Sequence, residues 1–310
     1  MTEPYASGML NVGDGNQIYW ETCGNPEGKP LVLLHGGPGQ GCNEAMRDSD
    51  HTDLYRIVLY DQRGCGRSTP NAADPATDMR FNTTAHLIAD LEILREHLGI
   101  DRWLLRGGSW GCTLALAYAL QYPHRVSEIV LSAITTTRRR EIDWLYGGVS
   151  RFFPEQYQHF VAAAGGGEHV VAEYNRLLGH PDRDIRERAT EAWARWEETV
   201  LSLEPAAKPS AFSGPVTDDL LAMVRICAHF YANYGWLEDG ELIRDAGALA
   251  DIPGVLVHGR QDLSCPVETA YELVNAWPGA ELFVCDRSGH LGSPAKREYI
   301  HNALSRFADC

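Results

Sequence analysis

The chain has 310 residues, with 42 acidic and 27 basic side chains that give a formal net charge of −15 at pH 7. Hydrophobic residues make up 44% of the chain and charged residues 22%, which is typical of a globular protein and excludes extensive disorder. The acidic balance argues against nucleic acid and against an anionic membrane surface as partners, because both bind basic protein surfaces.

The first residues, MTEPYASGMLNVGDG, contain neither a basic segment nor an apolar segment, so they do not resemble a signal peptide. No run of 18 apolar residues is present, and we expect no membrane span. The eight cysteines are scattered and form no Cys-x-x-Cys pair, which favours reduced thiols and a cytoplasmic location. Because no His-Glu-x-x-His helix or Cys/His knuckle is present, we expect no metal.

Short apolar runs bounded by glycines alternate with helical segments in the first part of the chain. Strands are predicted at 31–34, 56–60, 102–106 and 126–133, and helices at 83–98 and 114–120. Because strands alternate with helices, the pattern predicts an α/β fold with a doubly wound, mostly parallel sheet and helices on both of its faces.

The pattern changes after about residue 134 and changes back near residue 249. The stretch between has helical periodicity without a clear strand, and strand patterns return after it. The elements predicted in this second part are a helix over 189–200, linkers at 165–167 and 205–215, strands at 254–259 and 280–284, and a helix at 299–307. We therefore predict a core domain, 1–134 and 249–310, interrupted by a helical cap domain, 135–248.

The string Gly107-x-Ser109-x-Gly111 lies between a predicted strand and a predicted helix. Glycines on both sides of a serine allow the sharp turn of a nucleophile elbow, in which strand and helix come close and the hydroxyl is lifted out of the sheet. The N-terminus of the helix then points at the serine and favours an oxyanion. Taken alone, the string is equally compatible with a plain glycine turn, so the prediction for Ser109 depends on partner residues.

A serine hydroxyl needs a base to become a nucleophile, and the base needs an orienting acid. In a doubly wound hydrolase these groups follow in the order Ser, Asp or Glu, His, each in a loop after a later strand. Asp262 and His290 each follow one of the two late strands. The sequence therefore predicts a catalytic triad of Ser109, Asp262 and His290. Asp61 is a rival acid, but it precedes the serine and fits a structural turn better.

A glycine-rich string, HGGPG at 35–39, follows the first predicted strand. Glycines allow a backbone N–H to approach a substrate carbonyl without a Cβ in the way. We predict an oxyanion hole formed by the N–H groups of Gly37, which we favour over Gly36, and of Trp110, the residue after the nucleophile.

Several strings together resemble one known family. HGGPG, DQRGCGRS and GGSWG, followed by EIDWLYGGVSRFFPEQY, AWARWE and AWPGAEL, closely resemble the proline iminopeptidases, serine peptidases of the α/β-hydrolase fold. The resemblance covers nearly the whole chain. It implies that the helical cap covers the active site, that no cofactor is needed, and that proline is removed from the N-terminus of short peptides.

The resemblance also implies pocket residues. Glu197 matches a family carboxylate that binds the free amine, which is reasonable because a buried ammonium needs a paired carboxylate; the alternative is a solvated helix residue. Cys265 matches a cysteine that lines the family's proline pocket. A second family carboxylate lies in an ENHYF string, which reads CAHFY at 227–231 here. Cys227 thus replaces a glutamate, and Tyr231 ends the matching stretch.

Other positions also depart from the family pattern. Ser132 and Thr135 replace an arginine and an aromatic residue, and Leu145 stands where the family usually has an aromatic residue. Loss of one buried charge partner weakens binding of the same cation by about 2–5 kcal/mol. Glu238 and Asp239 are candidates to replace the lost charge. Without a replacement, either another N-terminal residue is accepted or the substrate is not a peptide amine.

Three functions remain open from the sequence. The first is a serine hydrolase of the proline iminopeptidase type that releases an N-terminal proline or a related small residue. The second is an esterase or amidase with the same triad that acts on a non-proline substrate, such as a specialised metabolite. The third, a binding protein on an inactive hydrolase fold, is disfavoured because all three triad residue types are present. We expect a small-molecule or short-peptide substrate and a monomer or small homo-oligomer.

Overall fold

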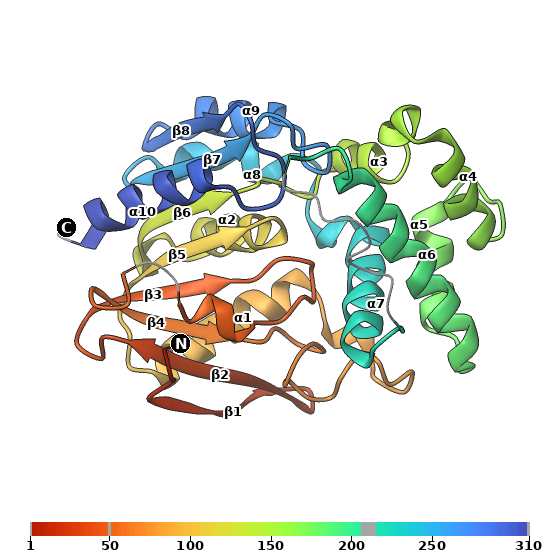
Figure 1. The fold of residues 1–310 in the computed structure, drawn as a ribbon. Helices are drawn as coiled ribbons and strands as arrows, with labels where there is room; N and C mark the ends of the chain where they lie inside the picture. The colour runs from red at the N-terminus through yellow and green to blue at the C-terminus, as the bar shows by residue number, and fades with distance from the viewer. Residues whose placement is uncertain (1, 49–50, 206–214, 309–310) are drawn as a thin grey trace.

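A single 8-stranded sheet runs through the protein, with strand order β1-β2-β4-β3-β5-β6-β7-β8 (Figure 1). The computed structural model describes residues 2–48, 51–205 and 215–308. The strands are β1 (Ala6–Gly13), β2 (Asn16–Gly24), β3 (Lys29–Leu34), β4 (Tyr55–Tyr60), β5 (Trp103–Gly108), β6 (Val126–Ser132), β7 (Gly254–Gly259) and β8 (Ala280–Cys285). Pairing is parallel from β4 to β8 and antiparallel where β2 joins β1 and β4, so the predicted mostly parallel sheet is confirmed.

The sequence analysis does not predict strands β1 and β2. The local sequence feature that indicates them is the turn between them. They form a hairpin closed at Asp14-Gly15, where both residues have positive φ, 53° and 75°. Asp-Gly is the preferred pair for such a turn, since positive φ at both positions matches the twist of the paired strands. The exposed outer strand lacks the buried apolar run that marks the central strands.

Helices cover both faces of the sheet, as the alternation of strands and helices predicted. These helices are α1 (Thr84–His97), α2 (Trp110–Gln121), α9 (Glu268–Ala276) and α10 (Pro294–Ala308). Leu105 of β5 packs in one apolar cluster with residues of α1, α2 and α9. The preceding residue, Leu104, packs on the other face with residues of α10. Successive strand residues point to opposite faces, which is why the buried strands are apolar at every position.

Between β6 and β7 the described residues form helices and turns, in line with the predicted helical cap. The helices are α3 (Arg139–Leu145), α4 (Pro154–Ala163), α5 (Val170–Leu178), α6 (Arg183–Leu201), α7 (Asp218–Ala232) and α8 (Glu241–Arg244). The larger cap helices lie beyond the carboxyl ends of β3 and β5 (Figure 1). Most of the predicted linker at 205–215 lies outside the described residues.

Buried aromatic rings give these helices an apolar cluster of their own. Phe160 stacks on Tyr174 with ring centroids 4.6 Å apart and packs against Trp193 and Trp196. This separate cluster supports the proposal that residues 135–248 form a domain inserted in the core. None of the helices in the described part of the chain is both long and apolar enough to cross a membrane.

Candidate active site

A pocket of about 230 Å³ lies where the loops after the parallel strands meet the cap. It is lined by Gly37, Gln40, Ser109, Thr135, Thr137, Glu141, Ile142, Leu145, Tyr146, Glu197, Leu201, Tyr231, Ser264, Cys265 and His290. The pocket is smaller than the roughly 300–1,000 Å³ sites that hold drug-sized ligands. Its size therefore fits a short acyl group better than an extended one.

Ser109 sits on a sharp turn between β5 and α2. Its backbone angles, φ 54° and ψ −125°, lie in a region that non-glycine residues rarely adopt. A Cβ on Gly107 would overlap the Gly111 carbonyl, and a Cβ on Gly111 would overlap the Leu34 carbonyl. The glycines thus allow α2 to pack close against the sheet, which places the N-terminus of α2 at the serine, as predicted for a nucleophile elbow.

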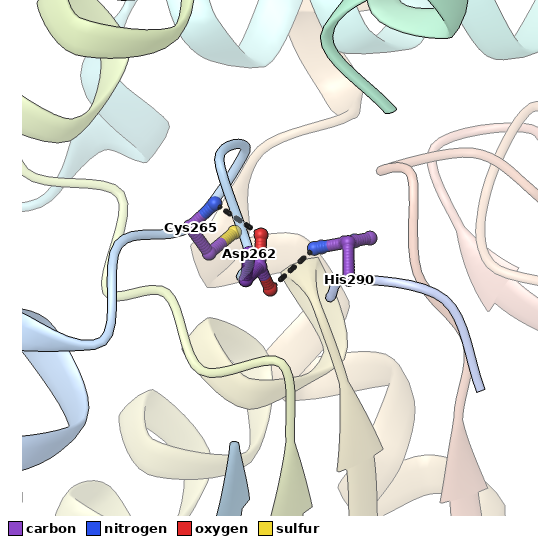
Figure 2. A group of neighbouring side chains, drawn as sticks. All are labelled: Asp262, Cys265 and His290. Carbon is purple, nitrogen blue, oxygen red and sulfur yellow. Dashed lines mark hydrogen bonds and ion pairs between the residues drawn. The ribbon is translucent and has the colours of Figure 1, made fainter. Parts of the chain in front are cut away.

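A hydrogen bond joins the side chains of Asp262 and His290 (Figure 2). His290 Nδ1 lies 3.0 Å from Asp262 Oδ2, and the Asp262 side chain is fully buried. Burial by itself would lower the pKa of His290, but the charge and hydrogen bond of Asp262 hold that pKa above its ordinary value. Burial alone would raise the pKa of Asp262, yet the charge of His290 and its hydrogen bond hold it below its usual range. This arrangement stabilises an imidazolium.

Ser109 and His290 line the same pocket. No hydrogen bond to the Ser109 hydroxyl is present within the described residues. The structure thus brings the three predicted triad residues to one site, and a hydrogen bond joins two of them, Asp262 and His290.

Cys265 completes the group drawn in Figure 2. Its backbone N–H donates to Asp262 Oδ1 at 2.7 Å, while Oδ2 is used by His290. One ligand-type atom each from Asp262, Cys265 and His290 lies within 4.8 Å of the others. Since both carboxylate oxygens already accept hydrogen bonds, we interpret the group as a hydrogen-bonded network, and the absence of a metal stays a prediction.

A second histidine supports the acid. His258, at the end of β7, accepts a hydrogen bond from the Ile134 N–H at Nδ1, so its proton lies on Nε2. Nε2 lies 2.8 Å from the Cys265 carbonyl and 3.7 Å from Asp262 Oδ2. Burial lowers the pKa of His258, which keeps this ring neutral. It therefore holds the loop that carries Asp262 without competing for the charge.

Of the two predicted oxyanion donors, Trp110 directly follows the nucleophile, and Gly37 lines the same pocket as Ser109. Trp110 begins α2, and N–H groups in the first turn of a helix have no partner inside the helix. Gly37 lines the pocket with φ 109°, a conformation open to glycine but not to other residues. The Tyr231 hydroxyl donates to the Gly37 carbonyl at 2.9 Å, so a cap helix holds this loop in place.

Hydrogen bonds through Gln62 connect two sequence motifs, HGGPG and DQRG, to each other and to Trp110. The Gln62 N–H donates to His35 Nε2 at 3.1 Å, and the Gln62 side chain accepts from Trp110 Nε1 at 3.1 Å. This connects the HGGPG and DQRG loops to the start of α2. Asp61 does not line the pocket: its carboxylate accepts from the Cys42 N–H and from Arg67, in agreement with the expected structural turn.

Glu197 lies in the wall of the pocket, on α6. Tyr146 and Trp193 donate to Oε1 at 2.7 and 2.8 Å, and Oε2 has no hydrogen-bond partner within the described residues. Burial raises the pKa of Glu197, although these two hydrogen bonds act in the opposite direction. These two hydrogen bonds and the place of Glu197 in the pocket wall disfavour the alternative of a solvated helix residue. A half-buried carboxylate with one oxygen unpartnered among the described residues favours a cationic ligand group.

Cys227, an expected pocket residue, is not among the residues that line the pocket. Its thiol donates to the Pro38 carbonyl at 3.1 Å, and burial raises its pKa well above the ordinary value. Glu238 and Asp239 do not replace the lost charge: they contact Arg244 and the Arg139 N–H outside the pocket.

Glu141 is the other acidic side chain among the described residues that line the pocket. Its two oxygens accept from the side chain and N–H of Arg138, from Thr269 and from the 135–136 segment. This charge is already balanced. Among the described residues, Glu197 therefore provides the carboxylate oxygen of the pocket that has no hydrogen-bond partner.

Sequence reasoning missed several residues that shape the site. Tyr146 and Trp193 orient Glu197, and the i, i+4 spacing of Trp193 and Glu197 on one helix was a usable signal. Two others, Glu204 and Lys296, bind the backbone of the loop that carries His290. They lie far apart in the chain, and no local pattern joins them.

Comparisons with known proteins agree with this geometry. The α/β-hydrolase-fold family matches residues 29–294. The chain is 44% identical to a probable proline iminopeptidase of Streptomyces coelicolor over 99% of this chain and 96% of that protein. It is 45% identical to a proline iminopeptidase of Xanthomonas citri, covering 98% and 97% of the two chains.

Among solved structures, a proline iminopeptidase of Mycobacterium smegmatis has a TM-score of 0.65 over 98% of both chains, at 21% sequence identity. At that identity the likeness concerns the fold. It agrees with the predicted α/β-hydrolase architecture.

Replacing Ser109 with alanine tests the nucleophile. We expect kcat to fall by about three to six orders of magnitude, because the attacking oxygen is removed. The midpoint of thermal unfolding should stay within about 2 °C of wild type, since the hydroxyl makes no hydrogen bond within the described residues. Substantial activity in a folded Ser109→Ala protein would contradict the assignment.

The raised pKa of His290 predicts the acid limb of the pH profile. The imidazole must be neutral to accept the Ser109 proton, so activity is lost as pH falls through its pKa. Since Asp262 raises that pKa, kcat/KM should fall with a midpoint above the ordinary value of 6.5. Steady-state rates measured from pH 5 to 9 provide the test, and a midpoint below 6.5 would show that the Asp262 contact does not govern the base.

Proposed function

Because this chain belongs to the proline iminopeptidases of the α/β-hydrolase family, we propose that it removes an N-terminal proline, or a closely related small residue, from short peptides. The observation that carries the proposal is the half-satisfied Glu197 carboxylate, which shares a pocket of about 230 Å³ with Ser109 and His290. A substrate with an amine close to its scissile carbonyl matches a pocket lined by both a carboxylate and the proposed nucleophile and base.

The reaction follows from the groups around Ser109. His290 takes the hydroxyl proton while the serine oxygen attacks the carbonyl of the N-terminal residue, and Asp262 stabilises the imidazolium. The N–H groups of Gly37 and Trp110 bind the oxyanion. His290 then gives the proton to the departing peptide amine. A water molecule hydrolyses the acyl-enzyme by the same steps, which releases the free amino acid and restores Ser109.

Glu197 anchors the substrate amine in this proposal. Its Oε2 has no hydrogen-bond partner in the part of the chain that the structure describes, whereas Tyr146 and Trp193 hold Oε1 and so fix the carboxylate plane. A protonated imino group of proline has two N–H donors. The apolar side chains of Leu145, Ile142 and Tyr231 around the pocket suit the hydrocarbon ring of proline.

The second candidate, an esterase or amidase acting on a non-proline substrate, has the same triad. This candidate was suggested by Leu145 and Cys227, because both residues depart from the pattern of the family at pocket positions. The comparisons favour the peptidase, because relatives named proline iminopeptidase match over almost the entire chain. A cytoplasmic location and a monomer or small homo-oligomer remain proposals that rest on the sequence.

A substrate panel tests the proposed specificity. We expect the proline derivative to have the highest kcat/KM among aminoacyl-naphthylamides, by about tenfold or more over leucine, because a pocket this small discriminates by 1–3 kcal/mol. The same preparation should hydrolyse p-nitrophenyl acetate more slowly. Preference for simple esters over the proline derivative would contradict the peptidase and favour the second candidate.

A substitution of Glu197 by glutamine tests the amine anchor. We expect kcat/KM for aminoacyl substrates to fall by about 30- to 1,000-fold, since a buried ammonium loses its charged partner. Hydrolysis of an amine-free ester should change by less than about threefold. Glu191→Gln, an exposed position on the same helix, is the matched control. Equal losses on both substrate types would mean that Glu197 has only a structural role.

A further inference from the structure

The loop that carries His290 is bound on its N–H side by a carboxylate from the cap. Glu204, three residues after the end of α6, accepts hydrogen bonds from the N–H groups of His290, at 2.6 Å, and Leu291, at 3.0 Å. Glu204 Oε1 accepts from the His290 N–H, and Oε2 accepts from the Leu291 N–H. The Glu204 side chain is almost fully buried, although it belongs to the segment that follows a cap helix.

The same loop is bound on its carbonyl side by an ammonium from the core. Lys296, in the first turn of α10, donates to the carbonyls of Gly289, His290 and Leu291 at 3.0, 2.9 and 3.3 Å. It is 3% exposed, which is unusual for a lysine. Two buried side chains of opposite charge, Glu204 and Lys296, thus bind the backbone of residues 289–291. The peptide groups between them are oriented so that each charge partly compensates the other.

Gly289 gives an independent indication that this contact is close. A Cβ at this position would overlap the Glu204 carboxylate, and the atoms it would meet first all belong to Glu204. The backbone of Gly289 does not have a positive φ, so conformation alone does not require glycine here. What excludes a larger residue is the carboxylate itself.

We propose that Glu204 and Lys296 are positioning residues that clamp the backbone of residues 289–291 and so hold the His290 imidazole at the pocket. Because Glu204 follows the helix that carries Glu197, the clamp ties the base to the cap element that binds the substrate amine. The proposal rests on His290 acting as the base of the proposed function. It does not depend on which acyl group is accepted.

The clamp also acts on the charge of the base. Asp262 and Glu204 favour the imidazolium of His290, whereas Lys296 opposes it. The other ionisable groups that interact with this ring are His258, which is neutral, and Glu197 on α6. Removing the negative charge of Glu204 should lower the pKa of His290, and removing the positive charge of Lys296 should raise it. The two variants therefore shift the base in opposite directions.

Glu204→Gln and Lys296→Met test the proposal on p-nitrophenyl acetate, and Ser109→Ala gives the background rate. We expect each variant to lower kcat/KM by about 10- to 100-fold, because charged hydrogen bonds to the loop are lost. The acid midpoint of the pH profile should move down in Glu204→Gln and up in Lys296→Met, each by about half a unit or more. Glu191→Gln and Arg297→Met, at exposed positions on α6 and α10, are the matched controls.

Equal losses of activity with unmoved midpoints would overturn the proposal, because a merely structural role lowers activity without changing the pKa of the base. Shifts in the same direction would also overturn it. If Lys296→Met does not fold, as judged by circular dichroism, the direction found for Glu204→Gln decides alone. Because p-nitrophenyl acetate contains no proline, its rate of hydrolysis reports on the base even if proline is not the substrate.

A double-mutant cycle tests the contact directly. Gly289→Ala should lower kcat/KM by about tenfold or more in the wild type, because the added methyl displaces the Glu204 carboxylate. In a Glu204→Ala background the same substitution should change kcat/KM by less than about threefold, since the space is then free. Equal effects of Gly289→Ala in the two backgrounds would show that the carboxylate does not hold the loop.

Discussion

The parallel pairing of the strands from β4 to β8 is the constraint on which the site depends. In a parallel sheet the carboxyl ends of the strands share one edge, so loops that follow different strands meet there. Ser109 follows β5, Asp262 follows β7 and His290 follows β8. The cap lies at this same edge, so cap residues such as Tyr146 and Glu197 form part of the pocket wall.

Four ionisable side chains near the proposed base show how a buried site separates like charges. Asp262, Glu197 and Glu204 are all carboxylates, and each uses its oxygens on different partners: an imidazole, two aromatic donors and two backbone N–H groups. Lys296 supplies a compensating positive charge next to the loop of His290. Since burial strengthens every electrostatic interaction, these fixed partners determine which group can change its protonation during a reaction.

The fold was predictable where a strand or helix carries its own local pattern. Buried strands are recognisable because both faces are covered, and helix α1 shows an apolar stripe. The first two strands were missed because β1 is largely exposed, although the Asp14-Gly15 turn gave a local signal. Helix α2 begins at Trp110, earlier than predicted, since the elbow at Ser109 leads directly into the helix.

By itself, the sequence determined the fold class and placed the three residues of the proposed triad after strands, because glycine turns and apolar runs are local features. The resemblance supplied Glu197 as a pocket residue. Only the tertiary structure decided that the Cys227 thiol bonds the Pro38 carbonyl and does not line the pocket, and that Glu204 and Lys296 bind the backbone of the loop of His290. Those contacts join residues that are distant in the chain, so their existence depends on how the cap and the core pack together, which no local pattern records.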